Sequence, residues 1–201
     1  MNDDALHHKR KMQKRQELQK TIVASKTEEK GLLMVHTGTG KGKSTAAFGL
    51  LFRHLSYGFK SVVIQFIKAP EWKTGEQRMV EFFPDLLEWH TLGKGFTWNT
   101  QDKQKDIESC QAAWSLALDY LNRENISLVV LDELNIALRY NYLDPDQIIR
   151  DLQQRPKMQH VVITGRNAPQ KLIDAADMVT EMKLIKHPFN AGIKAQKGIE
   201  Y

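Results

Sequence analysis

Cysteine is nearly absent from this chain, because Cys110 is the only one among 201 residues. A single thiol excludes an intramolecular disulfide and is typical of a reducing compartment, so we expect a cytoplasmic protein. Cys110 lies beside Ala112, Ala113 and Trp114 in a stretch with helical character. We therefore expect a buried and inert thiol there and not a nucleophile.

Long apolar runs are also absent. No segment approaches the roughly 20 apolar residues that a membrane-spanning helix needs. The N-terminal residues carry charge but lack the apolar segment that secretory signals contain. We therefore expect neither a membrane partner nor export.

The histidines and the basic residues lack the arrangements that bind zinc or nucleic acid. None of the seven histidines shows a His-x-x-x-His spacing with a third ligand on offer, so we expect no zinc site. A formal net charge of +5 would suit nucleic acid. Much of it lies in residues 7–20, however, and zinc-finger spacing and aromatic-rich basic strands are missing. We expect a solvated excess of charge and no nucleic-acid partner.

What the chain contains from residue 31 onward is an alternation of short apolar runs with helical patterns. Runs rich in valine and isoleucine between helices predict an α/β fold with a mostly parallel sheet and helices on both faces. In such folds ligands bind at the carboxyl ends of the strands. The expected strands are 32–35, 62–66, 86–89, 128–131, 161–163 and 178–184, and the expected helices are 43–56, 76–82, 102–122, 146–153 and 168–175.

The chain is expected to have two parts. Residues 1–30 are polar and rich in lysine, glutamine, arginine and glutamate, which is typical of an exposed helix or a partly disordered arm. Such an arm often becomes ordered against a partner, for example a second subunit. Residues 31–201 are long enough to form one domain with a sizeable core.

A glycine-rich segment with two lysines follows the first expected strand and precedes the first helix of the domain. Glycines let several backbone N–H groups face one point, and the helix N-terminus adds partial positive charge. Lys43 can neutralise phosphate oxygens, and the Ser44 hydroxyl can ligate Mg²⁺. The segment therefore predicts a phosphate-binding loop and a P-loop (RecA-like) three-layer fold. The candidate nucleotide-binding residues are Gly38, Thr39, Gly40, Lys41, Gly42, Lys43, Ser44 and Thr45.

The loop departs from the usual pattern at two positions. Thr37 stands where a phosphate-binding loop has its first glycine, and Lys41 is an additional lysine inside the turn. Two neighbouring lysines would repel each other without an anion between them. The departure indicates a specialised loop that differs from those of ordinary motor or signalling ATPases.

Three further groups are expected near this loop. Asp132 and Glu133 end a buried run, where such carboxylates help hold Mg²⁺, and which of them ligates the metal stays open. Arg166 follows another run and could reach a phosphate, although a surface arginine is nearly as good an interpretation. Phe96 and Trp98 lie in a glycine-bounded loop and suggest a large, flat, apolar co-substrate, unless they are simply core residues.

Taken together, these segments resemble the corrinoid adenosyltransferases of the CobA/BtuR/CobO type. The resemblance covers about residues 31–201, with Thr39, Ser44 and Asn99 as small departures from the usual family residues. It rests on the segments 37–47, 63–68 (Val-Ile-Gln-Phe-Ile-Lys), 95–98 (Gly-Phe-Thr-Trp), 130–134, 163–166 and 192–201 in this order.

The resemblance implies an enzyme in which the Co(I) of a corrinoid attacks the 5′-carbon of ATP and triphosphate leaves. The loop, with Lys41, Lys43 and Mg²⁺, would hold the triphosphate. Phe96 and Trp98 would line the corrinoid site and help keep the lower face of cobalt free of an axial ligand. The resemblance also implies a homodimer, a flavodoxin-type electron donor, and cobalamin or a precursor such as cobinamide as substrate.

Two other functions remain open from the sequence. One is a RecA-like ATPase or kinase, which would cleave near the γ-phosphate and be stimulated by nucleic acid or an acceptor. The other is a nucleotide-sensing regulator, which would bind ATP without turnover. Both share the phosphate loop with the adenosyltransferases, so only the products distinguish the three.

Overall fold

The protein is described from a computed structural model, which covers residues 3–68, 74–93 and 102–200. By its internal contacts the chain divides into two units, Met1–Lys30 and Gly31–Tyr201. The first contains a single long helix, α1 (Asp3–Ala24), whose residues are exposed from Asp4 onward. Its sequence is mostly polar, and its few apolar side chains, Leu18 and Ile22 among them, are exposed.

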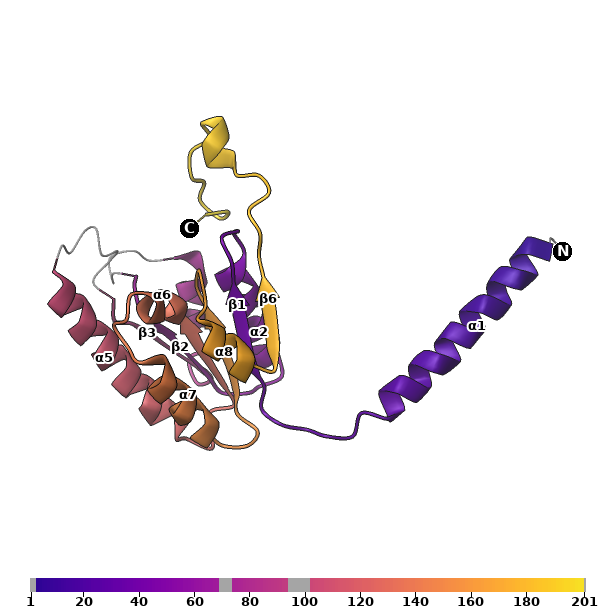
Figure 1. Cartoon of the computed structure of the whole chain (residues 1–201), viewed down its shortest axis with the longest axis horizontal. Coiled ribbons are helices and arrows are strands. Elements are labelled where there is room, and N and C mark those ends of the chain that lie inside the picture. The colour runs from indigo at the N-terminus through magenta and orange to yellow at the C-terminus, as the bar shows by residue number, and fades with distance from the viewer. Residues whose placement is uncertain (1–2, 69–73, 94–101, 201) are drawn as a thin grey trace. The chain divides into compact units, whose positions relative to one another are not determined.

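The second unit is built on a sheet of six strands (Figure 1). They run in the order β3-β2-β4-β5-β1-β6, and every neighbouring pair is parallel. The central strands are almost wholly buried, as expected for a sheet covered on both faces. Their bounds are β1 Leu33–Thr37, β2 Ser61–Gln65, β3 Leu87–Thr91, β4 Leu128–Asp132, β5 His160–Thr164 and β6 Met178–Glu181.

Helices cover the two faces of the sheet and make three layers. On one face lie α2 (Lys43–Ser56) and α3 (Met79–Phe82), the latter preceded by the 3₁₀ turn η1 (Gly75–Arg78). The other face carries α5 (Lys103–Leu121), α6 (Leu134–Arg139), α7 (Pro145–Gln154) and α8 (Gln170–Ala175). A second 3₁₀ turn, η2 (Pro188–Ala191), lies in the C-terminal segment. The predicted α/β three-layer fold is confirmed.

Each face has its own apolar core because the side chains of a strand alternate between the two sides. Phe48, Leu51 and Leu55 of α2 pack on one side, against the set Met34, Val63, Val130 and Val162. Trp114, Leu138 and Leu152 pack on the other, against the set Val35, Ile64, Leu131 and Ile163. These valine- and isoleucine-rich strands are the runs that predicted the sheet.

The observed elements differ from the expected ones at a few ends. The strand expected over 178–184 stops at Glu181, because Met182 turns to accept a hydrogen bond from Gly40 N at 2.6 Å. The helix expected over 76–82 begins as the 3₁₀ turn η1, and the short helix α6 was not predicted. The tertiary contact at Met182 overrides a local preference for strand.

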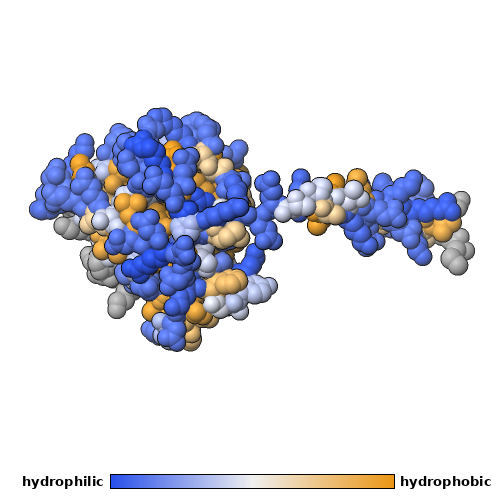
Figure 2. All heavy atoms as spheres, turned by 90° about the horizontal axis from the view of Figure 1, so that it is seen from below, coloured by the Kyte–Doolittle hydropathy of each residue, from blue (hydrophilic) through white to orange (hydrophobic). Residues whose placement is uncertain are grey.

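The visible surface is mostly hydrophilic, with scattered apolar side chains (Figure 2). Among the described residues, no helix combines the length and the apolar character needed to cross a membrane.

Candidate active site

The glycine-rich loop joins the carboxyl end of β1 to the amino end of α2. Gly38 and Gly42 have φ angles of 97° and 100°, in the left-handed region that favours glycine. A Cβ on Gly38 would lie 2.4 Å from the carbonyl oxygen of Met182, so a side chain there is excluded. Gly42 is the N-cap residue of α2, which directs the helix N-terminus at the loop. The loop therefore has the backbone geometry of an anion-binding site.

Thr37, the residue in place of the usual first glycine, has a structural role. It is the last residue of β1, and its Oγ1 accepts a hydrogen bond from Ala168 N at 2.9 Å. Its carbonyl oxygen accepts another from Met182 N at 2.9 Å. A glycine could not make the first contact. Thr37 thereby fixes the segments that follow β5 and β6 against the start of the loop.

Lys43 is the buried cation of the loop, with 8% of the residue exposed. Its Nζ donates a hydrogen bond to the carbonyl oxygen of Gly40, so the side chain lies back across the turn. Burial lowers the pKa of Lys43, Glu133 and Asp132 raise it in part, and the charges of Arg166 and Lys41 lower it further. A positive charge so poorly solvated is well suited to a bound anion.

A row of polar residues crosses the carboxyl end of the sheet on the α2 side, one from each strand. Neighbouring members are paired in the strand register, or follow directly after a registered pair. Among them, both ring nitrogens of the buried His36 have no hydrogen-bond partner within the described residues. The row consists of Thr91, Gln65, Asp132, Thr164, His36 and Thr180.

Asp132 is the centre of this row and is completely buried. Its Oδ1 accepts hydrogen bonds from Ser44 Oγ and Thr164 Oγ1, each at 2.7 Å. Its Oδ2 accepts from Gln65 Nε2 at 2.9 Å and from Lys68 Nζ at 3.3 Å. Burial alone would raise the pKa of Asp132, but the Lys68 charge and these hydrogen bonds outweigh it and lower the pKa. The carboxylate is therefore ionised and has all four acceptor positions filled.

Glu133 differs from Asp132 in its backbone conformation and in its hydrogen bonding. It adopts the left-handed backbone conformation, with φ 64° and ψ 17°, and its N–H donates to Thr164 Oγ1 at 3.0 Å. Its Oε2 is buried and has no hydrogen-bond partner in the described part of the chain. Burial and the Asp132 charge raise the pKa of Glu133 to about 7. An unusual backbone and an unpaired buried carboxyl oxygen are typical of functional residues.

The structure brings most of the candidate residues together. Arg166 follows β5 and is exposed, and its charge lowers the pKa of both Lys43 and Glu133. Thr39 and Thr45 are exposed in or beside the loop. The other two candidates, Phe96 and Trp98, lie outside the described residues.

Gln65, Lys68 and Thr164 have contacts in the site that the sequence interpretation did not assign. All three contact Asp132, two of them as the last residues of buried strands. A polar residue that ends an apolar strand at the carboxyl edge of a parallel sheet is the signal that could have identified them.

Lys41, the additional lysine, pairs with the C-terminal segment. Its Nζ lies 2.6 Å from Glu200 Oε2, while 60% of the lysine side chain is exposed. The hydrogen bond from Lys41 lowers the pKa of Glu200, so the carboxylate is ionised at neutral pH. The ammonium group that could bind a phosphate oxygen is thus shared with an internal anion.

Replacing Glu200 with glutamine should therefore tighten ATP binding, because a neutral amide competes less strongly for Lys41. An exposed ion pair of this kind supports an increase of no more than about fivefold in affinity. Isothermal titration with ATP measures it, and Glu124→Gln, which removes an exposed carboxylate before β4, is the matched control. Unchanged or weaker binding in Glu200→Gln would contradict the competition.

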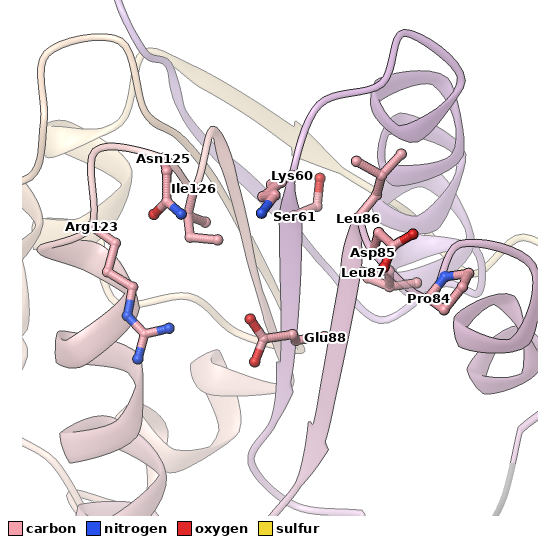
Figure 3. A pocket seen from close by; sticks show the side chains of 10 residues that line it. All are labelled: Lys60, Ser61, Pro84, Asp85, Leu86, Leu87, Glu88, Arg123, Asn125 and Ile126. Atoms are coloured by element: carbon pink, nitrogen blue, oxygen red, sulfur yellow. The ribbon is translucent and has the colours of Figure 1, made fainter.

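A separate cavity of about 210 Å³ lies at the other end of the strands from the phosphate loop. Figure 3 shows the side chains that line it. It opens beside the amino ends of β2 and β3, and Lys60, Glu88 and Arg123 are among its lining residues. The side chains of Glu88 and Arg123 extend toward each other across it (Figure 3). Ligands of parallel α/β sheets bind at the carboxyl ends of the strands, so the candidate active site is at the phosphate loop and not here.

Known proteins resemble the chain over nearly its whole length. The family described as ATP:corrinoid adenosyltransferase BtuR/CobO/CobP matches residues 29–201. A corrinoid adenosyltransferase of Sinorhizobium sp is 51% identical over 99% of this chain and 93% of its own. One from Pseudomonas aeruginosa is 50% identical over 96% of this chain and 95% of its own. One from Escherichia coli (strain K12) is 41% identical over 89% of this chain and 90% of its own.

The matched range includes every described residue of the site, from Thr37 to Glu200. The sequence motifs had already suggested the same family, and these identities over nearly the full length agree with that resemblance. The chain therefore belongs to the ATP:corrinoid adenosyltransferase BtuR/CobO/CobP family and is an enzyme of the transferase class.

Proposed function

We propose that this enzyme transfers the 5′-deoxyadenosyl group of ATP to the Co(I) of a corrinoid and releases triphosphate. Cobalamin and a precursor such as cobinamide are both candidate acceptors. The observation that carries the proposal is the phosphate loop with two lysines, Lys41 and Lys43, beside a carboxylate-centred polar row. Two lysines suit this reaction because the leaving group is a whole triphosphate, which carries more negative charge than one phosphoryl group.

In this reaction the enzyme supplies placement and charge stabilisation, because the cobalt is the nucleophile. The electron pair of Co(I) forms the bond to C5′, and the pair of the C5′–O bond leaves with the triphosphate. Charge therefore builds on the phosphate oxygens as the bond breaks. Lys43, the N–H groups of the loop and the N-terminus of α2 act on this charge where little water competes. Lys41 adds a second cation to the same anion.

The site also fits a magnesium ion on the triphosphate. Ser44 donates its single hydroxyl proton to Asp132, so its lone pairs remain for a cation. Glu133 offers an unpaired buried carboxyl oxygen, and hard oxygen ligands are those that Mg²⁺ prefers. Ser44 and Glu133 would contact the ion, while Asp132, whose acceptor positions are filled, would hold Ser44. Bound Mg²⁺ would neutralise charge on the phosphate oxygens.

Phe96 and Trp98 are proposed to line the corrinoid site, on the basis of the family resemblance. If they keep the lower face of cobalt free of an axial ligand, they ease reduction of Co(II) by a flavodoxin-type donor. Phe96→Ala and Trp98→Ala should then reduce the rate from Co(II) more than the rate from chemically reduced Co(I). Equal losses in the two assays would count against this role.

We also propose that the enzyme works as a homodimer.

The product assay tests the proposed reaction. The enzyme is incubated with ATP, Mg²⁺ and chemically reduced cobalamin or cobinamide under anaerobic conditions. The expected products are a light-sensitive adenosylated corrinoid and triphosphate in equal amounts. ADP and phosphate would instead indicate an ATPase or kinase, and tight ATP binding without turnover would indicate a nucleotide-sensing regulator. Either result overturns the proposal.

A further inference from the structure

The polar row continues beyond Asp132 toward the edge strand β3, and this part has no assigned role. We propose that Trp89 and Thr91 are positioning residues that act through Gln65: they orient its amide so that Asp132 holds Ser44 ready for the metal ion. The inference rests on the proposed function, because it concerns the same magnesium site. The role proposed for the two residues runs through Gln65 and not through a contact with either substrate.

The contacts form a continuous chain of hydrogen bonds. Trp89 Nε1 and Thr91 Oγ1 both donate to Gln65 Oε1, at 3.1 Å and 3.0 Å. Gln65 Nε2 in turn donates to Asp132 Oδ2 at 2.9 Å, and Asp132 Oδ1 accepts from Ser44. Gln65 is 2% exposed, so water has little access to its amide. These hydrogen bonds thereby connect the edge strand β3 to Ser44 of the phosphate loop. The path runs through Gln65 at the end of β2 and Asp132 at the end of β4.

The orientation of the Gln65 amide follows from its neighbour Trp89. An indole N–H can only donate, so the Gln65 oxygen must face Trp89 and its nitrogen must face Asp132. At the other end of the row the Glu133 N–H occupies one lone pair of Thr164 Oγ1, and the Thr164 proton is donated to Asp132 Oδ1. Asp132 therefore accepts from all its neighbours.

This arrangement determines the orientation of the Ser44 hydroxyl. Since Asp132 only accepts, the Ser44 proton must point to it, and the Ser44 oxygen presents acceptor positions to a ligand. A phosphate oxygen, itself an acceptor, would be repelled at this point, whereas a cation would be attracted. The orientation of a glutamine amide on β2 thus contributes to the preference for a metal ion in the loop.

Two donors on one carbonyl oxygen make the arrangement redundant. With either Trp89 or Thr91 removed, the other still pairs the Gln65 oxygen. With both removed, a buried carbonyl oxygen has no donor, which costs free energy comparable to a lost hydrogen bond. Rotation of the amide is the available relief, and rotation takes Nε2 away from Asp132. The two substitutions should therefore act synergistically and not additively.

The test compares Trp89→Phe, Thr91→Val and the double variant in the full-length protein. Trp89→Phe keeps an aromatic ring against Phe48, whose ring centroid lies 5.1 Å from that of Trp89. Trp89→Phe combined with Thr91→Ser, which keeps the hydroxyl, is the matched control for the double variant. For each variant, isothermal titration measures the Kd of ATP with Mg²⁺ and again with EDTA. The ratio of the two constants isolates the contribution of the metal ion from any general weakening of the site.

We expect each single variant to keep the Mg²⁺-dependent gain in ATP affinity within about twofold, and the double variant to lose about tenfold of it. Trp89→Phe combined with Thr91→Ser should behave as Trp89→Phe alone. Equal weakening with and without Mg²⁺, or an additive effect of the two substitutions, would mean a purely structural role and would overturn the inference. If the unaltered protein itself gains no ATP affinity from Mg²⁺, the proposed metal site fails and the inference fails with it. If it gains and the double variant gains equally, only the inference fails.

Discussion

Replacing Lys43 with alanine should reduce adenosyl transfer from ATP by at least about 100-fold, the usual effect of removing one preorganised charge-stabilising group. Lys43 is the buried cation of the loop, and its ammonium group lies within the turn that would enclose the triphosphate. The stabilisation is needed mostly as C5′–O breaks, so the loss should appear in kcat as well as in kcat/KM. Steady-state rates of adenosylated corrinoid formation at saturating ATP measure it.

Lys41→Ala is the matched control for this experiment. Its side chain is largely exposed and is shared with Glu200, so its removal should cost about tenfold or less. Both variants should unfold at the denaturant concentration of the unaltered protein within a small margin, since neither lysine supports the apolar core. A Lys43→Ala enzyme with a rate within threefold of normal would contradict the role of the loop.

Replacing Asp132 with asparagine should reduce both stability and activity. The buried carboxylate accepts four hydrogen bonds, whereas an amide accepts at one end only and presents its own N–H groups to two donors at the other. Lys68 also loses its counterion, although it is partly exposed and water can compensate. We expect the free energy of unfolding to fall by about 2–3 kcal/mol, as measured by urea denaturation. The rate should fall by up to about 100-fold, because one amide oxygen cannot hold Ser44 at one end and pair Gln65 and Lys68 at the other.

Glu133→Gln provides the contrast, because the buried Oε2 of Glu133 has no hydrogen-bond partner among the described residues. Its pKa is raised to about 7, above the usual value near 4.5, so the folded protein binds its proton more tightly than the unfolded chain does. The contribution of Glu133 to the free energy of unfolding is therefore fully present below pH 4.5 and is lost as the pH rises through about 7. Glu133→Gln should therefore be at least as stable as the unaltered protein at pH 8. A large loss of stability there would contradict the difference drawn between the two carboxylates.

The fold and the loop could be predicted because their signals are local. Helix α2 has the predicted bounds, since glycines before it and apolar residues on one face of it are both neighbours in sequence. The buried strands β1, β4 and β5 were identified within two residues at each end for the same reason. The strand expected to reach residue 184 was too long, because its end is set by a contact with Gly40 about 140 residues earlier.

The sequence by itself thus determined the α/β class, the phosphate loop with Lys41 and Lys43, and the acidic end of β4. Only the tertiary structure decided that Gln65, Lys68 and Thr164 converge on Asp132, and that Glu200 pairs with Lys41. The physical reason is the range of the interaction. Backbone preference and burial act over a few residues, whereas the register of parallel strands and the path of the C-terminal segment bring together side chains far apart in the chain.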